Sequence, residues 1–147
     1  MKRRYYMVII NNLQFGEKVT DAREIVRLLF ENKIWLFSPF TPKVNSLRAC
    51  DRLLVYAAGK GNRCFLGEST LVEPPKALHT VPKQLKNLAT IYSLGSGITD
   101  EILWPDVKPI MDLLPKLSFV KDKKNYGLYL RQGLRELSEE DYIVIKG

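Results

Sequence analysis

The chain is poor in the residues that most often hold metals or act as nucleophiles. It has one histidine, His79, and two cysteines, Cys50 and Cys64, among 147 residues. The cysteines form no CxxC motif, and His79 has no cysteine or carboxylate at metal-ligand spacing beside it. We therefore expect no structural zinc site. Both cysteines stand in apolar contexts, which predicts reduced thiols in or near the core rather than a disulfide.

Sequence motifs of known catalytic sites are missing too. There is no GxSxG turn, no phosphate-binding loop and no dinucleotide-binding fingerprint. The stretch "GKGN" at residues 59–62 fits a hairpin turn better than a phosphate cradle. A Cys64–His79 dyad is disfavoured because Cys64 lies inside a strand pattern, and the acidic pairs 100–101 and 139–140 fit solvated or helix-capping groups. We therefore predict a binding protein without a cofactor rather than an enzyme.

Long apolar runs are missing as well. No apolar stretch approaches the roughly 18 residues that a membrane helix needs. The start, "MKRRYYMVIINN", has too few apolar residues before Asn11 for a signal peptide. We expect a soluble, cytoplasmic protein with no membrane contact. At this length, one domain over residues 1–147 is the natural expectation.

Acidic residues are outnumbered by basic ones. The chain has 16 aspartates and glutamates against 23 lysines and arginines, which gives a net charge of +7. Nucleic acid is the commonest anionic partner of a small basic domain. A solvated, lysine-rich surface is the alternative that composition alone leaves open.

Short runs of β-branched and aromatic residues, separated by glycine and proline, dominate the pattern. They predict strands over residues 5–12 and 33–37. The clearest unit is a hairpin whose apolar strands, residues 53–58 and 64–72, flank the glycine turn. Further strand candidates are residues 88–94 and 142–145, and the segment 95–97 is expected to be flexible.

Helical signals are fewer. Apolar residues at helical spacing predict one amphipathic helix with Thr20 as its N-cap. A helical turn is expected at residues 110–114, and "SEED" at 138–141 fits a capping box that opens another. Residues 127–137 are expected to form a last hairpin or a bent strand. Many short strands with few helices predict a mixed α+β fold built as a small barrel.

A binding protein would use the aromatic and amide side chains at the strand ends. Trp35 stands just before a proline-broken loop, where an indole can stack on a base, although a core position is the commoner role. Asn11 and Asn12 end the first strand, and an amide can cap a turn or read a base edge. Ser38 is a further small polar candidate, and Trp104 is expected in an exposed loop.

The C-terminal stretch mixes basic and aromatic residues. Lys121, Lys123, Lys124 and Arg131 bracket Tyr126 and are well placed for phosphates. For about half of these charges, a solvated surface without a partner is the alternative. The acidic run that follows is expected to cap a helix away from the ligand. The apolar residues of this stretch are expected to close the barrel: Phe119, Leu128, Leu130, Leu134 and Leu137.

Three segments together resemble a known family, the EVE domains. The final segment, "LSFVKDKKNYGLYLRQGLRELSEEDYIVI", resembles the family's C-terminal signature, with its aromatic-Gly pair, its strand with Arg and its acidic "SEEDY" turn. "DRLLVYAAGKGNRCFLGESTLVEPP" resembles the family's central hairpin, and "YYMVIINN" resembles its first strand. The likeness covers most of the chain apart from roughly residues 76–103.

EVE domains are PUA-like barrels related to the YTH domains, so the resemblance implies a barrel of about five to six strands flanked by short helices. It also implies a pocket for a nucleobase, often a modified one. YTH domains hold methylated adenine in an aromatic cage, and "INN" and "IWLFS" here are similar in position to the strand end and cage wall of those domains. The residues that we assign to the base pocket are Asn11, Asn12, Trp35, Ser38, Tyr56 and Trp104.

Two positions depart from the family pattern. Cys50 replaces the usual glycine before Asp51, although glycine reaches a positive φ at little cost and cysteine does not. Tyr126 replaces the usual tryptophan of the aromatic-Gly pair. In the Trp35 region, the proline-rich stretch "SPFTPKVNSLRAC" fills the spacing to the hairpin and would shape the rim of the pocket.

The resulting hypothesis is a nucleic-acid-binding module that accommodates a flipped, modified nucleobase in a pocket of the barrel. The alternative is a PUA-like RNA-binding accessory domain that does not discriminate modified bases. The expected partner is DNA or RNA, and a partner enzyme in the same system is left open. An enzyme is a third class, and the missing catalytic motifs speak against it.

Overall fold

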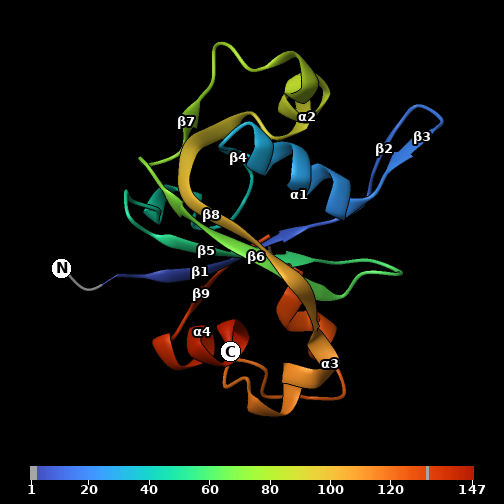
Figure 1. Cartoon of the computed structure of the whole chain (residues 1–147), viewed down its shortest axis with the longest axis vertical. Coiled ribbons are helices and arrows are strands. Elements are labelled where there is room, and N and C mark those ends of the chain that lie inside the picture. Colours follow the sequence, from blue (N-terminus) through green and yellow to red (C-terminus); the bar gives the residue numbers. More distant parts are fainter. Residues whose placement is uncertain (1–2, 132) are drawn as a thin grey trace.

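The computed structural model describes residues 3–131 and 133–147. Its centre is a curled sheet in which strands follow one another in the order β4-β8-β6-β5-β1-β9, with β7 paired to β8 (Figure 1). This architecture confirms the expected mixed α+β fold and its PUA-like small barrel. The strands of this sheet are β1 (Tyr5–Ile10), β4 (Ile34–Phe37), β5 (Arg52–Ala57), β6 (Cys64–Leu71), β7 (Lys76–Ala77), β8 (Leu94–Pro109) and β9 (Leu134–Leu137).

β1 occupies an inner position of the sheet. It pairs in parallel with β5 and antiparallel with β9, so that Tyr5 lies opposite both Arg52 and Leu137. β5 and β6 form the hairpin that the sequence predicts. In its turn, Gly59 and Gly61 have positive φ angles of 95° and 87°, which glycine adopts without steric cost. A separate small hairpin, β2 (Leu13–Phe15) with β3 (Lys18–Thr20), projects from the end of β1 (Figure 1).

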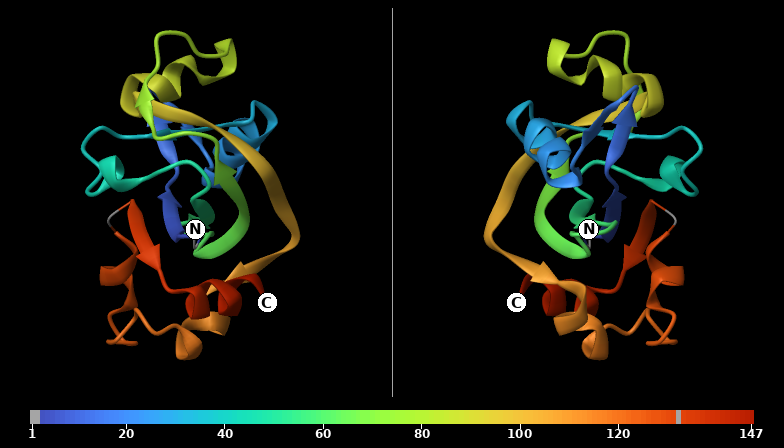
Figure 2. Two further views of the ribbon diagram at one scale, coloured as in Figure 1. Left: turned by 90° about the vertical axis from the view of Figure 1, so that its left-hand side faces the viewer. Right: turned by 90° about the vertical axis from the view of Figure 1, so that its right-hand side faces the viewer.

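β8 is long and bent, and it joins the two ends of the molecule (Figure 2). Its first residues pair with β4 and β7, and the rest pairs with β6. A Cβ atom on Gly95 would lie 2.7 Å from Leu78 Cδ1 and 3.0 Å from the Trp35 carbonyl oxygen. The prediction that residues 95–97 are a flexible segment is therefore wrong, because glycine here permits close packing of neighbouring strands.

Helix α1 (Ala22–Glu31) matches the predicted amphipathic helix, and its predicted apolar face is buried. Its N-cap is Asp21 rather than Thr20. The Asp21 carboxylate accepts a hydrogen bond of 2.8 Å from the Arg23 backbone N–H, whereas Thr20 still belongs to β3. The other α-helices are α2 (Lys86–Ile91), α3 (Ile110–Leu113) and α4 (Glu139–Lys146).

Two segments predicted as strands are helical. Residues 88–91 of the predicted strand 88–94 lie in α2, and Leu94 is the first residue of β8. Leu85 of η2 and Leu88 are both buried, and helical geometry places residues three apart on one face. "YIVI" belongs to α4, because Ser138 caps that helix by accepting a hydrogen bond from the Asp141 backbone N–H. Ser138 is therefore confirmed as the N-cap, but the Asp141 carboxylate accepts from Ser118 instead of returning the bond that would complete a capping box.

The segment before β9 also differs from the prediction. It contains a 3₁₀ helix, η4 (Tyr126–Leu130), where a hairpin or bent strand was expected. Leu130, Leu134 and Leu137 are buried as predicted, whereas Leu128 is exposed and does not help to close the barrel. The remaining 3₁₀ helices are η1 (Val44–Ser46), η2 (Lys83–Leu85) and η3 (Leu114–Lys116).

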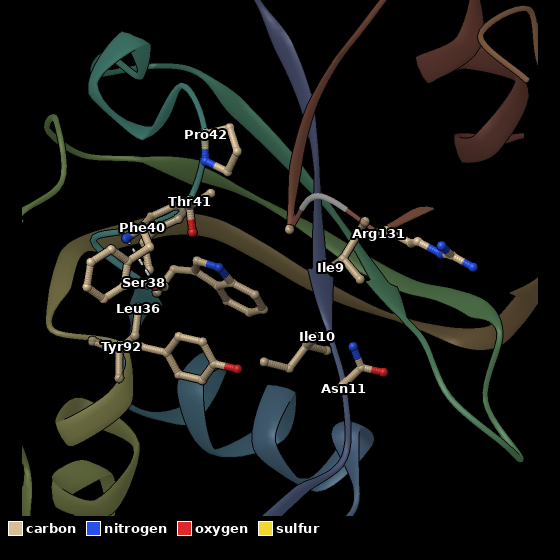
Figure 3. Close-up of a pocket in the computed structure, with 13 residues that line it drawn as sticks. Ile9, Ile10, Asn11, Leu36, Ser38, Phe40, Thr41, Pro42, Tyr92 and Arg131 are labelled. Atoms are coloured by element: carbon tan, nitrogen blue, oxygen red, sulfur yellow. Dashed lines mark hydrogen bonds between the residues drawn. The ribbon is translucent and has the colours of Figure 1, made fainter. Parts of the chain in front are cut away.

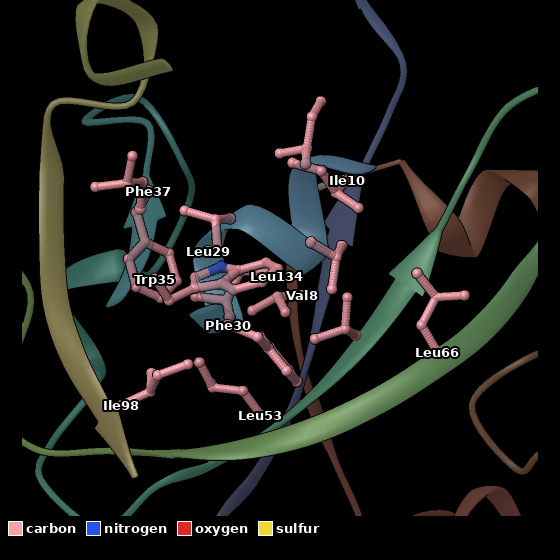
Figure 4. Close-up of a cluster of buried hydrophobic side chains, with 14 of the residues drawn as sticks. Val8, Ile10, Leu29, Phe30, Trp35, Phe37, Leu53, Leu66, Ile98 and Leu134 are labelled. Atoms are coloured by element: carbon pink, nitrogen blue, oxygen red, sulfur yellow. The ribbon is translucent and has the colours of Figure 1, made fainter. Parts of the chain in front are cut away.

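The sheet separates two hydrophobic clusters. Alternation along β1 sends Val8 and Ile10 to one cluster and Met7 to the other. The first cluster, shown in Figure 4, contains the buried face of α1 together with Trp35 and Phe37 of β4. The second contains α3, α4 and the other faces of β5 and β6. The barrel therefore has a core beneath α1 and a separate layer of helices on the outside.

A buried ion pair fastens α4 to the sheet. Arg52 Nε donates to Glu68 Oε1 at 2.7 Å, and both side chains are almost fully buried. The Tyr142 hydroxyl of α4 donates to the same Glu68 oxygen at 2.7 Å. Asp141 accepts hydrogen bonds from the Ser118 backbone N–H and hydroxyl. Asp141 of the acidic run thus binds α4 to the segment before it, in addition to lying in the capped first turn of that helix.

The two cysteines occupy different environments and are both free thiols. Cys64 is buried at the start of β6, as expected. Cys50 is exposed with a φ angle of 74°, so the prediction of a core or near-core position is wrong for this residue. The positive φ turns the chain into β5 and leaves the side chain in solvent. Among the described residues, no helix is both long enough and apolar enough to cross a membrane.

Candidate functional site

A cavity of about 280 Å³ opens where β1 and β4 end (Figure 3). Four separate parts of the chain line it: the end of β1, the end of β4 with the loop after it, the residue after α2, and the approach to β9. We call this cavity the Trp35 pocket. The lining residues are Ile9, Ile10, Asn11, Trp35, Leu36, Phe37, Ser38, Phe40, Thr41, Pro42, Tyr92, Arg131 and Gly133.

The pocket brings together four of the residues that the sequence singles out: Asn11, Trp35, Ser38 and Arg131. β1 and β4 both pass beside α1 in the first core, and each strand carries its polar end residue to the same side of the barrel. Asn11 is exposed and follows the last residue of β1. Ser38 follows the last residue of β4.

Trp35 forms part of the pocket wall while it is also a core residue. Only 2% of its surface is exposed, and its ring packs edge-on against Phe30 with ring centroids 6.2 Å apart. The two roles that the sequence leaves open for Trp35 are therefore both present. A ligand can reach only a small part of the indole as the pocket stands.

The loop after β4 contributes an aromatic ring that sequence reasoning missed. Phe40 is 90% exposed at the mouth of the pocket. Its backbone N–H donates to the Ser38 hydroxyl oxygen at 3.1 Å, and the Thr41 N–H donates to the Ser38 carbonyl at 3.1 Å, which makes a compact turn. The signal that could have revealed it is a phenylalanine in a proline-bounded loop, "SPFTP", where packing does not require one.

Tyr92 is a second lining residue that the sequence did not reveal, because residues 88–94 were predicted as a strand. It is half-buried at the end of α2, and in Figure 3 its hydroxyl points across the pocket toward Ile10. Burial raises the pKa of Tyr92 above its ordinary value. The hydroxyl therefore stays neutral near pH 7 and can both donate and accept a hydrogen bond.

Arg131 carries the only charge among the described lining residues. It is exposed, and in Figure 3 its guanidinium extends away from Phe40 and Tyr92. This position places a positive charge at the rim of the pocket rather than inside it. The interior is left to aromatic, aliphatic and neutral polar groups.

Asn12 lies outside the pocket lining. Its side-chain oxygen accepts hydrogen bonds from the Ala22 backbone N–H at 2.8 Å and from Asn62 Nδ2 at 3.1 Å. These bonds tie the end of β1 to the start of α1 and to the turn between β5 and β6. In this arrangement the Asn12 amide stabilises the fold.

Tyr56 and Trp104 pack in the second hydrophobic cluster and do not line the Trp35 pocket. Tyr56 is buried edge-on against Phe65, with ring centroids 5.1 Å apart. Trp104 lies within β8, so the expectation of an exposed loop is wrong. The pairing of β8 with β6 jumps from Leu103 to Lys108, and this irregularity admits the unpaired tryptophan within the strand. The Lys108 ammonium sits 4.7 Å from the Trp104 ring centre.

The C-terminal lysines occupy the loop before η4. Lys121, Lys123 and Lys124 are exposed, and the Lys123 ammonium donates to the Leu117 carbonyl at 2.7 Å. Tyr126 is half-buried at the start of η4. None of these four residues lines the Trp35 pocket, although η4 leads directly to Arg131 at its rim.

No protein-family model matches the sequence, and no curated protein matches it either. Solved structures do match it over nearly its whole length. Human THYN1 in complex with DNA containing 5-methylcytosine aligns with a TM-score of 0.63 at 11% identity, over 97% of this chain and 96% of that one. The YTH domain of Zygosaccharomyces rouxii MRB1 in complex with N6-methyladenosine RNA aligns with a TM-score of 0.61 at 13% identity, over 97% and 84%.

A bacterial protein gives the same result. Atu2648 of Agrobacterium tumefaciens aligns with a TM-score of 0.59 at 10% identity, over 97% of this chain and 91% of that one. Such low identities establish a shared fold and nothing more. The chain therefore has the PUA-like fold of the YTH domains and of THYN1, as the resemblance to EVE domains implies.

Proposed function

We propose that the protein is a nucleic-acid-binding module that accommodates one flipped, modified nucleobase in the Trp35 pocket. The observation that carries this proposal is the composition of the pocket: aromatic rings and neutral polar groups inside, and one arginine at the rim. Two proteins with this fold are solved with methylated nucleic acid, DNA with 5-methylcytosine in one case and N6-methyladenosine RNA in the other.

The aromatic residues supply the binding energy for the base. Trp35 and Tyr92 form the inner wall, and Phe40 stands exposed at the mouth where it can cover an inserted base. Stacking a base on an aromatic ring contributes about 1–3 kcal/mol. A methyl group buried among these rings adds about 0.8 kcal/mol, which corresponds to about fourfold in affinity. This term is the source of discrimination between the modified and the plain base.

Two neutral polar groups are available to read the edge of the base. The Asn11 amide has no hydrogen-bond partner within the described part of the chain, and it offers both a donor and an acceptor. The Ser38 oxygen accepts from the Phe40 N–H, which leaves the hydroxyl proton free to donate. Because Asn11 is exposed, a hydrogen bond to a base replaces one to water, so it selects a base with matching groups more than it adds affinity.

The nucleic-acid backbone would lie along Arg131 and the loop with Lys121, Lys123 and Lys124. Phosphate contacts of this kind fix the position of the strand but carry no sequence information. Each neutralised phosphate adds to the salt dependence, so affinity should fall steeply as salt concentration rises.

A binding role accounts for the pocket better than a catalytic one. The described lining residues include no carboxylate, histidine or cysteine, and burial raises the pKa of Tyr92. Near neutral pH, no group there exchanges a proton readily. We therefore propose that the protein binds its base without transforming it.

The alternative function is an RNA-binding accessory domain of the same fold without modified-base discrimination. The 2% exposure of Trp35 favours it, because the pocket offers little of the indole to a base unless the wall shifts. In that case the basic loop and Arg131 would provide the affinity, and plain and modified strands would bind equally.

Fluorescence anisotropy with short oligonucleotides tests the proposal. The panel contains DNA and RNA, single- and double-stranded, each with one plain, methylated or hydroxymethylated base, at two salt concentrations. One modified base should bind more tightly than its plain counterpart. Equal, salt-sensitive binding of all strands would establish the accessory role, and binding of none would exclude both functions.

Phe40→Ala is the sharper variant, because the side chain is 90% exposed and its loss leaves no internal cavity. It should lower the affinity for the modified strand by about 5- to 150-fold, the value of one stacking contact. Ile143→Ala removes an exposed apolar side chain from α4 and serves as the matched control. Unchanged affinity in Phe40→Ala would remove this ring from the binding site.

A further inference from the structure

We infer that a second cavity beside the Trp35 pocket holds the neighbouring nucleotide of the same strand, with its base against Tyr126 and its phosphate at Arg63. This inference rests on the proposed function, because it needs a strand that places one base in the first pocket. It adds a second subsite and two specific contacts to that function.

The second cavity has a volume of about 270 Å³, close to that of the Trp35 pocket. It lies between the turn of the β5–β6 hairpin and η4. Tyr56, Gly59 and Arg63 line it from the hairpin side. Tyr126, Gly127 and Leu130 line it from the side of η4. We call it the Tyr126 cavity.

The linings of the two cavities meet at two places. Leu130 lines the Tyr126 cavity and the next residue, Arg131, lines the Trp35 pocket. On the other side, Gly59 of the Tyr126 cavity approaches Asn11 of the Trp35 pocket so closely that a Cβ on Gly59 would lie 3.5 Å from Asn11 Oδ1. A strand that leaves the first pocket past Asn11 or Arg131 thus meets the second cavity next.

The cavity offers a surface for stacking. Tyr126 is half-buried there, so its ring is held while part of it faces solvent. No atom lies within 4 Å of the place where a Cβ of Gly127 would be. A flat base can therefore approach the backbone beside Tyr126 closely, which a larger side chain at Gly127 would prevent.

The Tyr56 hydroxyl is a polar group beside the same cavity. The Tyr56 ring is buried, and its hydroxyl makes no hydrogen bond within the described residues but is not cut off from solvent. A hydrogen bond to a ligand would therefore replace one to water and would orient the base more than it strengthens binding. The nitrogen and oxygen atoms of a base edge are suitable acceptors and donors for it.

Arg63 adds a positive charge in an unusual backbone conformation. Its φ angle is 59°, a left-handed value that is energetically unfavourable for any residue other than glycine. The conformation is held by a hydrogen bond of 2.9 Å from the Ile110 N–H to the Arg63 carbonyl. The side chain is exposed and forms no ion pair within the described residues. Strain of this kind is common where a side chain must be presented to a ligand. A phosphate between the two cavities would give it a partner.

The test compares binding of short ligands that fill one cavity or both. The ligands are the modified nucleotide found by the oligonucleotide panel, dinucleotides with a neighbour on its 5′ or 3′ side, and the same dinucleotides with an abasic neighbour. The proteins are the wild type, Tyr126→Ala, Tyr126→Phe, Arg63→Gln and Arg27→Ala. Arg27 pairs with glutamates of α1 and lines neither cavity, so it controls for the loss of one positive charge outside the site.

The inference predicts that one dinucleotide binds more tightly than the mononucleotide and that the abasic neighbour removes most of the gain. Tyr126→Ala should lose about 5- to 150-fold on that dinucleotide and nothing on the mononucleotide, whereas Tyr126→Phe should keep the stacking contact. Arg63→Gln should reduce the slope of log affinity against log salt by about 0.7 for a single strand. Arg27→Ala should leave both the affinity for the dinucleotide and the salt slope unchanged.

The outcomes separate this inference from the proposed function. If modified mononucleotides bind but neither neighbour adds affinity, or if Tyr126→Phe, Tyr126→Ala and Arg63→Gln all behave as the wild type, the second subsite is refuted and the base pocket stands. If no modified ligand is preferred at all, the proposed function fails and the second subsite fails with it. Circular dichroism on each variant establishes that the half-buried Tyr126 position tolerates the change.

Discussion

Cys50→Gly should stabilise the protein, because the backbone at this position has a conformation that suits glycine. Cys50 has a φ of 74° in the turn before β5, and its N–H donates to the Leu71 carbonyl at 2.9 Å. A left-handed conformation costs a residue with a side chain about 1–2 kcal/mol. The thiol is exposed, so its removal sacrifices no packing.

The expected gain in stability is smaller than this cost, because glycine makes the unfolded chain more flexible. That added entropy lowers the free energy of unfolding by about 0.5–1 kcal/mol. The difference leaves a net stabilisation of about 0.5–1 kcal/mol. For a chain of this size, that corresponds to an increase of about 1–4 °C in the melting temperature. Urea unfolding should show the same gain as a higher midpoint with an unchanged slope.

Two neighbouring variants make the test specific. Cys50→Ala removes the thiol but keeps the strained backbone, so its free energy of unfolding should equal that of the wild type. Ala49→Gly places a glycine one residue earlier, where φ is not positive, and should destabilise by about 0.5–1 kcal/mol. A Cys50→Gly protein no more stable than Cys50→Ala would refute the reasoning.

Three further predictions concern buried side chains. Glu68→Ala should destabilise by about 3–5 kcal/mol, because it leaves Arg52 buried without its partner; a urea midpoint close to the wild-type value would contradict this. Burial, and then the hydrogen bond to Glu68, raise the pKa of Tyr142 from about 10 to about 12. The neutral phenol therefore contributes its full stability below pH 10, and this contribution is lost as the pH rises to 12. The stability difference between wild type and Tyr142→Phe should therefore shrink across that interval, and a constant difference in urea unfolding would count against it. Trp35→Ala should destabilise the protein by about 3–5 kcal/mol, whereas Phe40→Ala should stay near the wild type in thermal unfolding. Equal melting temperatures for the two variants would show that Trp35 is not packed as described.

The fold was predictable where the pattern is strong and local. The apolar face of α1 has a period that only a helix satisfies, and the glycine turn between two apolar runs allows little besides a hairpin. Ser138 with Asp141 three residues later is likewise a local signal, because the cap involves neighbours in sequence.

The sequence could not reveal features that depend on distant contacts. Residues 95–97 look flexible until Leu78 and the Trp35 carbonyl are seen against Gly95. Trp104 looks like a loop residue because "WP" interrupts a strand pattern, and only the irregular pairing with β6 shows how β8 continues past it. Propensity is a weak guide in such places, where tertiary packing decides.

The candidate site was predictable in part for the same reason. Asn11, Trp35 and Ser38 lie at strand ends, and their convergence follows from the strand positions that the resemblance implies. Tyr92 was hidden by the wrong strand assignment, and Phe40 by the irregular loop. The Asn12 amide could not be separated from that of Asn11, since its partners come from residues 10 and 50 positions away.

The pairing of β1 has a consequence for how the protein is made. β1 is synthesised long before its partner β9, which places Leu137 opposite Tyr5. During translation, β1 therefore has an open edge until β9 has left the ribosome. Because long-range strand pairing is slow and exposed strand edges aggregate, the nascent chain should depend on chaperone protection until β9 arrives.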